Sequence, residues 1–471
     1  MEYPIYLAGK WVKTDVEVPV CSSWDSNNYG KTWLAGISEL EEAVSAAKTA
    51  FPVLKKMPSW KKHELLLQMA HLLQENRQKM AEIISAEASK PMKYALGEVD
   101  RAIQVFIVAA EESRRLQGEY IKIDWTPAGE GKEGLVKWFP AGIVAGISPF
   151  NFPLNLSVHK IAPALAAGCP IILKPSRSTP LSTLFMAELF DTLDWPKGSL
   201  SILPMDRESG NRLVTHPDIA VLTFTGSPEV GWKMKSDCGK KKVVLELGGN
   251  AGVIIDKDAD LDTAVSKCLA GAFAYSGQVC IHAQRLYVHE DIFSEFSKRF
   301  VEKTKALKIG HPKEETTDIT AMIDEANAKR VKDWVNEAVD GGAKVLCGGK
   351  RDGATYYPTV LSETHKEMKV CSLEVFGPVV TLEPFSDFNE AVEWVNDSRY
   401  GLQAGIFTNS IQNMNHAFEH IDAGGVIIND IPTFRVDHMP YGGIKDSGLG
   451  REGIKYAMMD YMEMKLLVKP F

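Results

Sequence analysis

The chain of 471 residues is long enough for about three domains at roughly 100–200 residues each. Its content of 45% hydrophobic and 24% charged residues is typical of a globular protein with a sizeable core. The formal net charge of −8 argues against a general nucleic-acid binder, because such a protein needs a basic face to neutralise phosphates.

Cysteine usage and the first residues indicate the compartment. The seven cysteines are scattered and form no C-x-x-C pair, so neither a disulfide framework nor a thiolate zinc cluster is expected. The start of the chain lacks the basic region and apolar run of a signal peptide, and no stretch reaches the ~18 apolar residues of a membrane span. We therefore expect a cytoplasmic protein with no membrane partner.

The first part of the chain, residues 1–115, is predicted to be mostly helical. Ser38 and Glu41 form the pattern of a capping box at the start of the first helix. Apolar residues at helical spacing predict a second helix from Trp60 to Glu75 and a third from Tyr94 to Leu116.

The rest of the chain predicts a hairpin followed by two α/β series. Residues 118–136 contain short, alternating, Gly-rich segments, which are typical of a hairpin set apart from the core. From residue 142 onward, near-continuous apolar strands alternate with helices, and one series gives way to the next near residue 249. Such strands predict parallel sheets covered by helices on both faces. The expected fold class is α/β, with two doubly wound parallel-sheet domains and a small β-hairpin unit.

Two motif matches are interpreted as coincidental. Gly129–Gly134 fits G-x-G-x-x-G but lies in a charged turn, whereas the dinucleotide motif must follow a strand and open a helix. His416, Glu419 and His420 fit a zinc-protease pattern, but we expect Phe418 and its apolar neighbours to face the core, with both histidines toward solvent. No metal is therefore expected, and a zinc hydrolase is the weaker alternative function.

Three other residues are typical of acyl-transfer chemistry. Cys280 follows a long helix at the start of a loop, and Glu246 and Asn151 stand at the ends of two apolar strands. Ligand sites in open α/β sheets gather at such strand ends. Burying a carboxylate in an apolar strand costs free energy, so its presence there indicates a structural or catalytic role. A thiol nucleophile, a carboxylate base and an amide oxyanion donor form one catalytic set. A buried structural cysteine and a capping glutamate are the alternatives.

Seven motifs, in order and spacing, resemble the aldehyde dehydrogenase superfamily over essentially the whole chain. They are SPFNFP (148–153), LKPS (173–176), FTGSPEVG (224–231), LELGG (245–249), GQVC (277–280), EVFGP (374–378) and PYGGIKDSGLGREG (440–453). The resemblance implies a Rossmann-like NAD(P)-binding domain, a catalytic domain and an oligomerisation unit that pairs in a homodimer or homotetramer. Their expected ranges are 1–117 with 138–248, then 249–439, and 118–137 with 456–471, with 440–455 as a linking segment.

The resemblance also implies the site residues. Cys280 would be the nucleophile, and Asn151 would hold the oxyanion. Glu246 would activate water to hydrolyse a thioester to the free acid, whereas CoA-acylating members, which lack this glutamate, transfer the acyl group to CoA. Lys174 would bind the adenosine ribose and Glu374 the nicotinamide ribose. The full set expected at the cofactor is Ser148, Phe150, Lys174, Ser176, Arg177, Gly226, Ser227, Leu247, Glu374 and Phe376.

Arg177 indicates which cofactor is used. Many NAD-preferring relatives carry a glutamate at this position, which would repel a 2′-phosphate, whereas a cation attracts it. We therefore expect NADP to be used at least as well as NAD, while an ordinary exposed arginine is the alternative.

The substrate mouth is expected to be cationic, with Arg101, His159 and Arg435 beside the tunnel residues Phe152 and Tyr441. These cations favour a short polar or anionic aldehyde, as in lactaldehyde, non-phosphorylating glyceraldehyde-3-phosphate and succinic semialdehyde dehydrogenases. Phosphate-binding members also carry an arginine just before the nucleophile, where this chain has Val279, which weakens the phosphate interpretation. Alternatively, Arg101 pairs with Glu98, Arg435 pairs with Asp437, and His159 is a core histidine.

Overall fold

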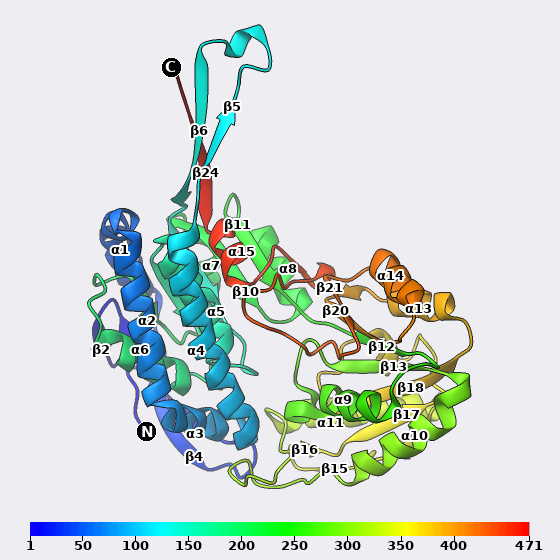
Figure 1. The fold of residues 1–471 in the computed structure, drawn as a ribbon. Coiled ribbons are helices and arrows are strands. Elements are labelled where there is room, and N and C mark those ends of the chain that lie inside the picture. Colours follow the sequence, from blue (N-terminus) through cyan, green and yellow to red (C-terminus); the bar gives the residue numbers. More distant parts are fainter. Residues whose placement is uncertain (471) are drawn as a thin grey trace.

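A computed structural model describes residues 1–470 and has a mixed α/β architecture. Two large sheets lie side by side, and a three-stranded sheet projects from them (Figure 1). Both large sheets are mainly parallel and covered by helices on two faces, which confirms the predicted fold class.

The first sheet has a parallel centre and antiparallel edges. Its strands, in spatial order, are β2 (Lys10–Val12), β1 (Ile5–Leu7), β9 (Leu200–Ile202), β8 (Ile171–Lys174), β7 (Ile143–Ile147), β10 (Ile219–Thr225), β11 (Lys242–Glu246) and β23 (Gly448–Leu449). The central strands from β9 to β11 are parallel, while β1, β2 and β23 run antiparallel to their neighbours.

Helices bury both faces of this sheet because their apolar residues recur at helical spacing. One face packs against α1 (Ile37–Lys56), α7 (Arg207–Thr215) and α8 (Pro228–Asp237). The other face packs against α5 (Asn155–Ala167) and α6 (Leu181–Asp191). Behind these lie α2 (Ser59–Glu75), α3 (Arg77–Ala88), α4 (Met92–Arg115) and α15 (Ile454–Asp460).

The second sheet is parallel except at one edge. Its strands, in spatial order, are β14 (Lys344–Cys347), β17 (Thr359–Ser362), β18 (Val379–Phe385), β13 (Ala283–His289), β12 (Ala251–Ile255), β20 (Gln403–Phe407) and β21 (Gly425–Ile428), of which β14 is antiparallel. Its helices are α9 (Leu261–Phe273), α10 (Glu290–Lys305), α11 (Glu325–Asp340), α12 (Lys369–Ser372), α13 (Phe388–Asn396) and α14 (Ile411–His420). A 3₁₀ turn, η2 (Ala274–Gly277), follows α9.

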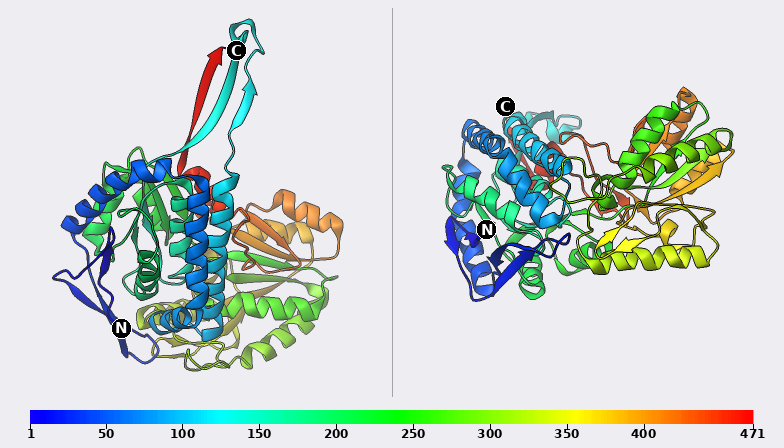
Figure 2. Two further views of the ribbon diagram at one scale, coloured as in Figure 1. Left: turned by 60° about the vertical axis from the view of Figure 1, so that its left-hand side comes forward. Right: turned by 90° about the horizontal axis from the view of Figure 1, so that it is seen from below.

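The projecting sheet joins two distant parts of the chain. The hairpin strands β5 (Glu119–Lys122) and β6 (Lys132–Pro140), with η1 (Pro127–Gly129) between them, are joined by β24 (Met462–Pro470) along the whole length of β6. Figure 2 shows this sheet standing clear of both large sheets. Three small two-stranded sheets complete the fold: β3 (Glu17–Cys21) with β4 (Asn28–Trp33), β15 (Arg351–Asp352) with β16 (Thr355–Tyr356), and β19 (Tyr400–Gly401) with β22 (Ile444–Lys445).

The N-terminal part differs from the sequence prediction. Residues 5–33 form the strands β1 to β4, and α3 stands between the second and third predicted helices. Strand β1 is fixed by pairing of Tyr6 with Ile202, a partner that local periodicity cannot reveal. The first helix begins earlier than expected: its N-cap is Gly36 rather than Ser38, and the Gly36 N–H donates to the Glu39 carboxylate at 2.7 Å.

The structure shows which elements contain the two motifs that were interpreted as coincidental. Gly129–Gly134 spans a 3₁₀ turn and the start of β6, as the turn interpretation predicted. On α14 the expectation for Phe418 is wrong: its side chain is exposed, because only Ala417 of that helix is fully buried against the sheet. No helix among residues 1–470 combines the length and apolar character needed to cross a membrane.

Candidate active site

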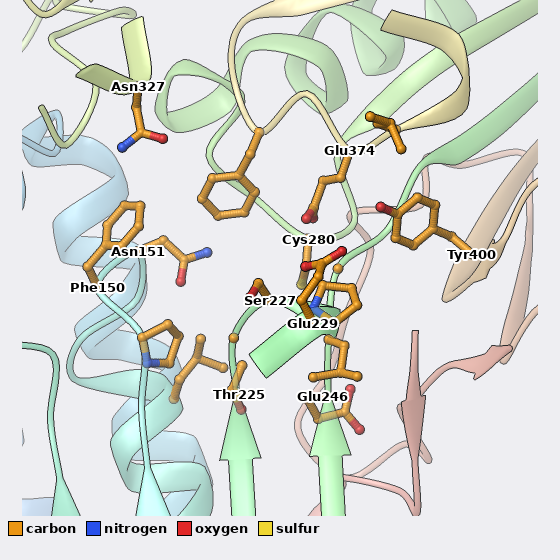
Figure 3. Close-up of a pocket in the computed structure, with 18 of the residues that line it drawn as sticks. Phe150, Asn151, Thr225, Ser227, Glu229, Glu246, Cys280, Asn327, Glu374 and Tyr400 are labelled. Carbon is orange, nitrogen blue, oxygen red and sulfur yellow. The ribbon is translucent and has the colours of Figure 1, made fainter. Parts of the chain in front are cut away.

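A cavity of 620 Å³ lies where β10 and β11 end, facing the loop before α5 and the loop after η2. Figure 3 shows Asn151 and Cys280 extending into it, with Glu246 at the end of its strand. The predicted site residues that line it are Phe150, Asn151, Gly226, Ser227, Glu246, Leu247, Cys280, Glu374 and Phe376. Side chains from the two large sheets therefore meet in a single cavity.

Two glycines in LELGG allow that convergence. A Cβ at Gly248 would lie 2.3 Å from a Glu374 carboxylate oxygen, and one at Gly249 would lie 2.2 Å from the Cys280 carbonyl oxygen. Both contacts are far shorter than van der Waals separation. At Gly249 the clash is with backbone, so only glycine lets the chain leaving β11 pass Cys280, whereas a side chain at position 248 would displace the Glu374 carboxylate.

The loop that carries the nucleophile is held in a strained form. Tyr275, Ser276 and Gly277 have φ of 49°, 52° and 69°, a left-handed run that is costly for residues other than glycine. The Tyr275 hydroxyl donates to the Ala88 carbonyl at 2.9 Å, and the Ser276 hydroxyl donates to the Thr320 carbonyl at 2.9 Å. Surrounding hydrogen bonds thus fix the direction in which Cys280 leaves the turn.

Asn151 is positioned by a buried ion pair that the sequence did not reveal. The Lys90 ammonium lies 2.5 Å from the Glu98 carboxylate and donates to the Asn151 carbonyl at 2.6 Å. The other Glu98 oxygen accepts from the N–H groups of Leu154 and Asn155, at the start of α5. The Asn151 amide in turn donates to the Gln278 carbonyl at 2.9 Å, beside the nucleophile.

Glu246 is a buried carboxyl group without a hydrogen-bond partner. Its side chain is 4% exposed, and neither carboxyl oxygen bonds to any group in the described part of the chain. Burial and the negative charge of Glu452 raise its pKa well above the ordinary value. A carboxyl group with a raised pKa binds a proton more readily than an ordinary carboxylate, as a general base requires.

The thiol of Cys280 lies beside a tyrosine. The Tyr441 hydroxyl and the Cys280 sulfur are 3.2 Å apart, within an apolar cluster that includes Phe152, Val279 and Ile281. Burial raises the pKa of Cys280 to about 12, while the hydrogen bond with Tyr441 acts in the opposite direction.

The cavity offers features that fit a dinucleotide. Ser227, the N-cap of α8, makes no side-chain capping bond and lines the cavity with Pro228 and Glu229, so the positive end of that helix lies at the cavity. Burial raises the pKa of Glu374 to about 8, and one of its oxygens accepts from the Gly249 N–H at 3.0 Å. Phe150 and Phe376 meet edge to face with centroids 5.9 Å apart.

The remaining predicted cofactor residues lie outside the lining of this cavity. Lys174 ends β8, and burial together with the charge of Arg177 lowers its pKa. Arg177 itself is exposed and has no ion pair within residues 1–470. Ser176 is half-buried, while Ser148 is buried with its hydroxyl 2.9 Å from that of Ser157.

The three predicted substrate cations do come together, but each is bound to a carboxylate or in contact with one. Asp437 accepts from Arg101 at 2.6 Å and lies 2.9 Å from the His159 ring. Arg435 donates to Glu452 at 2.8 Å. The alternatives that paired Arg101 with Glu98 and Arg435 with Asp437 are thus wrong, whereas His159 is a buried histidine with a partner.

The contacts within this cluster shift the pKa values of His159 and Asp437. Burial and the charge of Arg435 lower the pKa of His159. Burial opposes ionisation of Asp437, but His159 and Arg101 outweigh it and lower the pKa of that carboxyl. The Nε atoms of Arg101 and Arg435 are buried and donate to no group in the described chain.

Sequence reasoning missed other residues of the cavity wall. They are Pro149, Leu156, Thr225, Pro228, Glu229, Gly248, Asn327, Arg330, Trp334, Leu373 and Tyr400. Thr225 could have been found, because it ends an apolar strand just before Gly226, whereas the α11 residues reach the site only through the tertiary fold. No group of three or more potential metal ligands occurs within the described residues.

Comparison with known proteins identifies the family. The model of the aldehyde dehydrogenase family matches residues 11–467. A 3-sulfolactaldehyde dehydrogenase of Priestia aryabhattai is 42% identical over 468 residues, which cover 99% of this chain and 98% of that relative. The crystal structure of aldehyde dehydrogenase 21 from Physcomitrella patens in complex with the reaction product succinate matches with a TM-score of 0.98 and 45% identity, covering 100% of this chain and 98% of that one.

A second solved structure, an NADP-dependent glyceraldehyde-3-phosphate dehydrogenase from Bacillus halodurans complexed with NADP, matches with a TM-score of 0.96 and 34% identity, covering 100% of this chain and 99% of that one. The resemblance seen in the seven sequence motifs is thereby confirmed. The chain belongs to the aldehyde dehydrogenase family and is an oxidoreductase that acts on aldehydes.

Proposed function

We propose that this protein oxidises a short acidic aldehyde to its carboxylic acid through a covalent adduct on Cys280. The observation that carries the proposal is the convergence of Cys280, Asn151 and Glu246 on one cavity. Each supplies a distinct chemical function: nucleophile, oxyanion donor and general base.

Cys280, Asn151 and Glu246 each act in a different step of the proposed reaction. The Cys280 thiolate adds to the aldehyde carbonyl, and the Asn151 amide and the Cys280 N–H stabilise the oxyanion of the thiohemiacetal. When bound, a nicotinamide dinucleotide supplies the acceptor for the hydride lost as this adduct becomes a thioester. Glu246 then takes a proton from water, which hydrolyses the thioester and frees the acid. The unpartnered oxygens of Glu246 leave it free for that water.

The cofactor proposal rests on the fit of the same cavity. The open first turn of α8 suits a pyrophosphate, and the buried Glu374 carboxyl suits a ribose hydroxyl. Lys174 would bind the other ribose, with Arg177 exposed beside it. An unpaired arginine at that point favours NADP, which the Bacillus halodurans relative binds.

Arg177→Glu is expected to reverse the cofactor preference. The wild-type protein should use NADP at least as well as NAD, and the variant should lose ~10–100-fold in kcat/KM for NADP, because charge-assisted bonds to phosphate are replaced by repulsion. Its kcat/KM for NAD should change little. The measurement is absorbance of the reduced cofactor at one aldehyde concentration. Arg115→Glu, an exposed substitution at the end of α4, is the control, and a strong NAD preference in the wild type would contradict the proposal.

The acidic substrate is supported by buried donors and by relatives. Arg435 contacts Tyr441, whose hydroxyl contacts Cys280, so one side chain separates this guanidinium from the nucleophile. Arg101 is 32% exposed, which leaves it reachable from outside. The compounds in the names of the three relatives carry a sulfonate, a carboxylate and a phosphate. Because Val279 offers no further cation, we favour the carboxylate and the sulfonate.

An aldehyde panel tests both the reaction and the substrate class. Carboxylate- and sulfonate-bearing aldehydes should show higher kcat/KM than neutral aldehydes of equal length, and Cys280→Ser should abolish turnover of all of them. Arg101→Ala should raise KM for the acidic aldehydes by ~10–100-fold, the loss of one charge-assisted hydrogen bond, without affecting neutral ones. Arg114→Ala, an exposed change on the same helix, is the control. Preference for a neutral aldehyde would contradict the substrate proposal alone.

We further propose a role for each segment of the chain. Residues 1–117 and 138–248 would bind the cofactor, residues 249–439 would supply the nucleophile, and 440–455 would link them to the tail. The hairpin and tail (118–137 and 456–471) would pair with a second copy. The exposed apolar side chains of β24 (Met464, Leu466, Leu467 and Val468) support this pairing.

A further inference from the structure

Tyr441, which the sequence predicted to line the substrate tunnel, is buried with its hydroxyl against the Cys280 sulfur. Its side chain is 3% exposed, and its hydroxyl lies 3.2 Å from the Cys280 sulfur. That hydroxyl has no other hydrogen-bond partner in the described chain. A phenol buried in an apolar cluster normally needs a partner for its O–H group, and here the partner is the sulfur.

A cation lies against the ring of the same tyrosine. The Arg435 guanidinium carbon is 3.8 Å from the Tyr441 ring centroid, well inside the range of a cation–π contact. Arg435 is 6% exposed, so little water screens its charge. A cation on the face of a phenol withdraws electron density from the ring and makes the O–H a stronger donor.

Glu452 fixes the cation and the ring relative to each other. Its carboxylate accepts from Arg435 at 2.8 Å. Its backbone pairs with that of Tyr441 in both directions, with the Tyr441 N–H donating at 3.0 Å and the Glu452 N–H at 2.6 Å. One residue therefore holds both members of the cation–π pair, and the hydroxyl is aimed at the sulfur by a rigid arrangement.

We propose that Tyr441, polarised by Arg435, donates its hydroxyl hydrogen bond to the Cys280 sulfur and thereby stabilises the thiolate. This inference rests on the proposed role of Cys280 as the nucleophile. Tyr441 must be the donor in the reactive state because a thiolate has no proton to give.

The charges around Cys280 give this contact its importance. Glu246 and Glu374 line the same cavity as the thiol, and when ionised each disfavours a second negative charge on Cys280, in addition to the effect of burial. Tyr441 and Arg435 are the groups that act in the opposite direction. The Tyr441 hydroxyl and the Arg435 guanidinium thus lower the pKa of Cys280, against burial and the two carboxyls, which favour the protonated thiol.

Tyr441→Phe tests the proposal because it removes only the hydroxyl. The rate of Cys280 alkylation by iodoacetamide is measured between pH 7 and pH 9, with the modified peptide quantified by mass spectrometry. At pH values below the thiol pKa, the thiolate fraction falls tenfold for each unit by which that pKa rises. We expect the variant to alkylate roughly tenfold more slowly at each pH, the loss of one hydrogen bond to a charged group.

Two comparisons separate this effect from a general structural one. Tyr6→Phe removes a buried hydroxyl that donates to Asp191 at 2.8 Å in the first sheet, and it should leave alkylation of Cys280 unchanged. Replacing all tyrosines with 3-fluorotyrosine makes the phenol a stronger donor. It should accelerate alkylation in the otherwise wild-type chain but not in Tyr441→Phe.

Equal or faster alkylation of Tyr441→Phe would overturn the inference, as would an absence of any fluorotyrosine effect. The assay contains neither aldehyde nor nicotinamide cofactor. A Tyr441-dependent alkylation without aldehyde oxidation would therefore contradict the proposed function alone. Normal oxidation with Tyr441-independent alkylation would contradict this inference alone.

Discussion

Glu246→Gln is expected to stop turnover after the first half of the reaction. On the proposed mechanism the adduct on Cys280 still forms and is oxidised, because neither step needs Glu246. Hydrolysis loses its base, and general bases contribute about 10²–10⁴-fold, so steady-state turnover should fall roughly a thousandfold. Stopped-flow absorbance should show a burst of reduced cofactor close to one per active site. Mass spectrometry should find the acyl group on the peptide that contains Cys280.

The pH profile provides a second readout of the same residue. A general base acts in its ionised form, and burial with the charge of Glu452 raises the pKa of Glu246. Wild-type kcat should therefore increase with pH through that raised pKa, and Glu246→Gln should lose this limb of the profile. Glu383→Gln is the matched control, since Glu383 is a carboxyl with a burial-raised pKa that binds Thr364 in a different cavity. Wild-type turnover in Glu246→Gln would exclude the proposed base.

The parts of the fold that the sequence predicted are those with local signals. Parallel strands buried on both faces have near-continuous apolar runs, so β7, β10 and β11 were recognisable without knowledge of their partners. The ends of those strands then indicated Asn151 and Glu246. Cys280 needed the surrounding motif, because a single cysteine gives no signal of its own.

The parts that were missed depend on partners far away in the chain. The short strands β1 and β2 exist because β1 pairs with β9, almost 200 residues later. The ion pair of Arg101 with Asp437 joins residues 336 positions apart, so the sequence suggested the nearer Glu98 instead. The sequence offered Glu98 for Arg101 and Asp437 for Arg435, but the fold brings Asp437 and Glu452 against them, because a sequence does not report which distant carboxylates will lie near a cation.

Lys90 and Glu98 illustrate the same limit in the machinery that places Asn151. Each looks like an ordinary charge near the end of a helix or within it, yet both side chains are fully buried and 2.5 Å apart. Burial lowers the pKa of Lys90, and the charge of Glu98 opposes that shift. A cation in such a place persists only with its carboxylate, and the pair then holds the Asn151 carbonyl and the start of α5.

Lys90→Met is therefore expected to destabilise the protein by about 3–5 kcal/mol, because it leaves the Glu98 carboxylate buried without its cation. Chemical denaturation followed by fluorescence measures the change in the free energy of unfolding. Arg77→Met is the matched control: Arg77 joins α3 to Asp100 of α4 through an exposed ion pair, which should be worth less than about 1 kcal/mol.

The double variant Lys90→Met/Glu98→Gln separates stability from catalysis. Removing both charges should recover much of the lost stability, because no unpaired ion is left in the core. Turnover should stay low, since no ammonium then holds the Asn151 carbonyl and its amide is free to leave the oxyanion position. Recovery of both properties would mean that the loop before α5 keeps Asn151 in place without the ion pair, and that Lys90 has only a structural role.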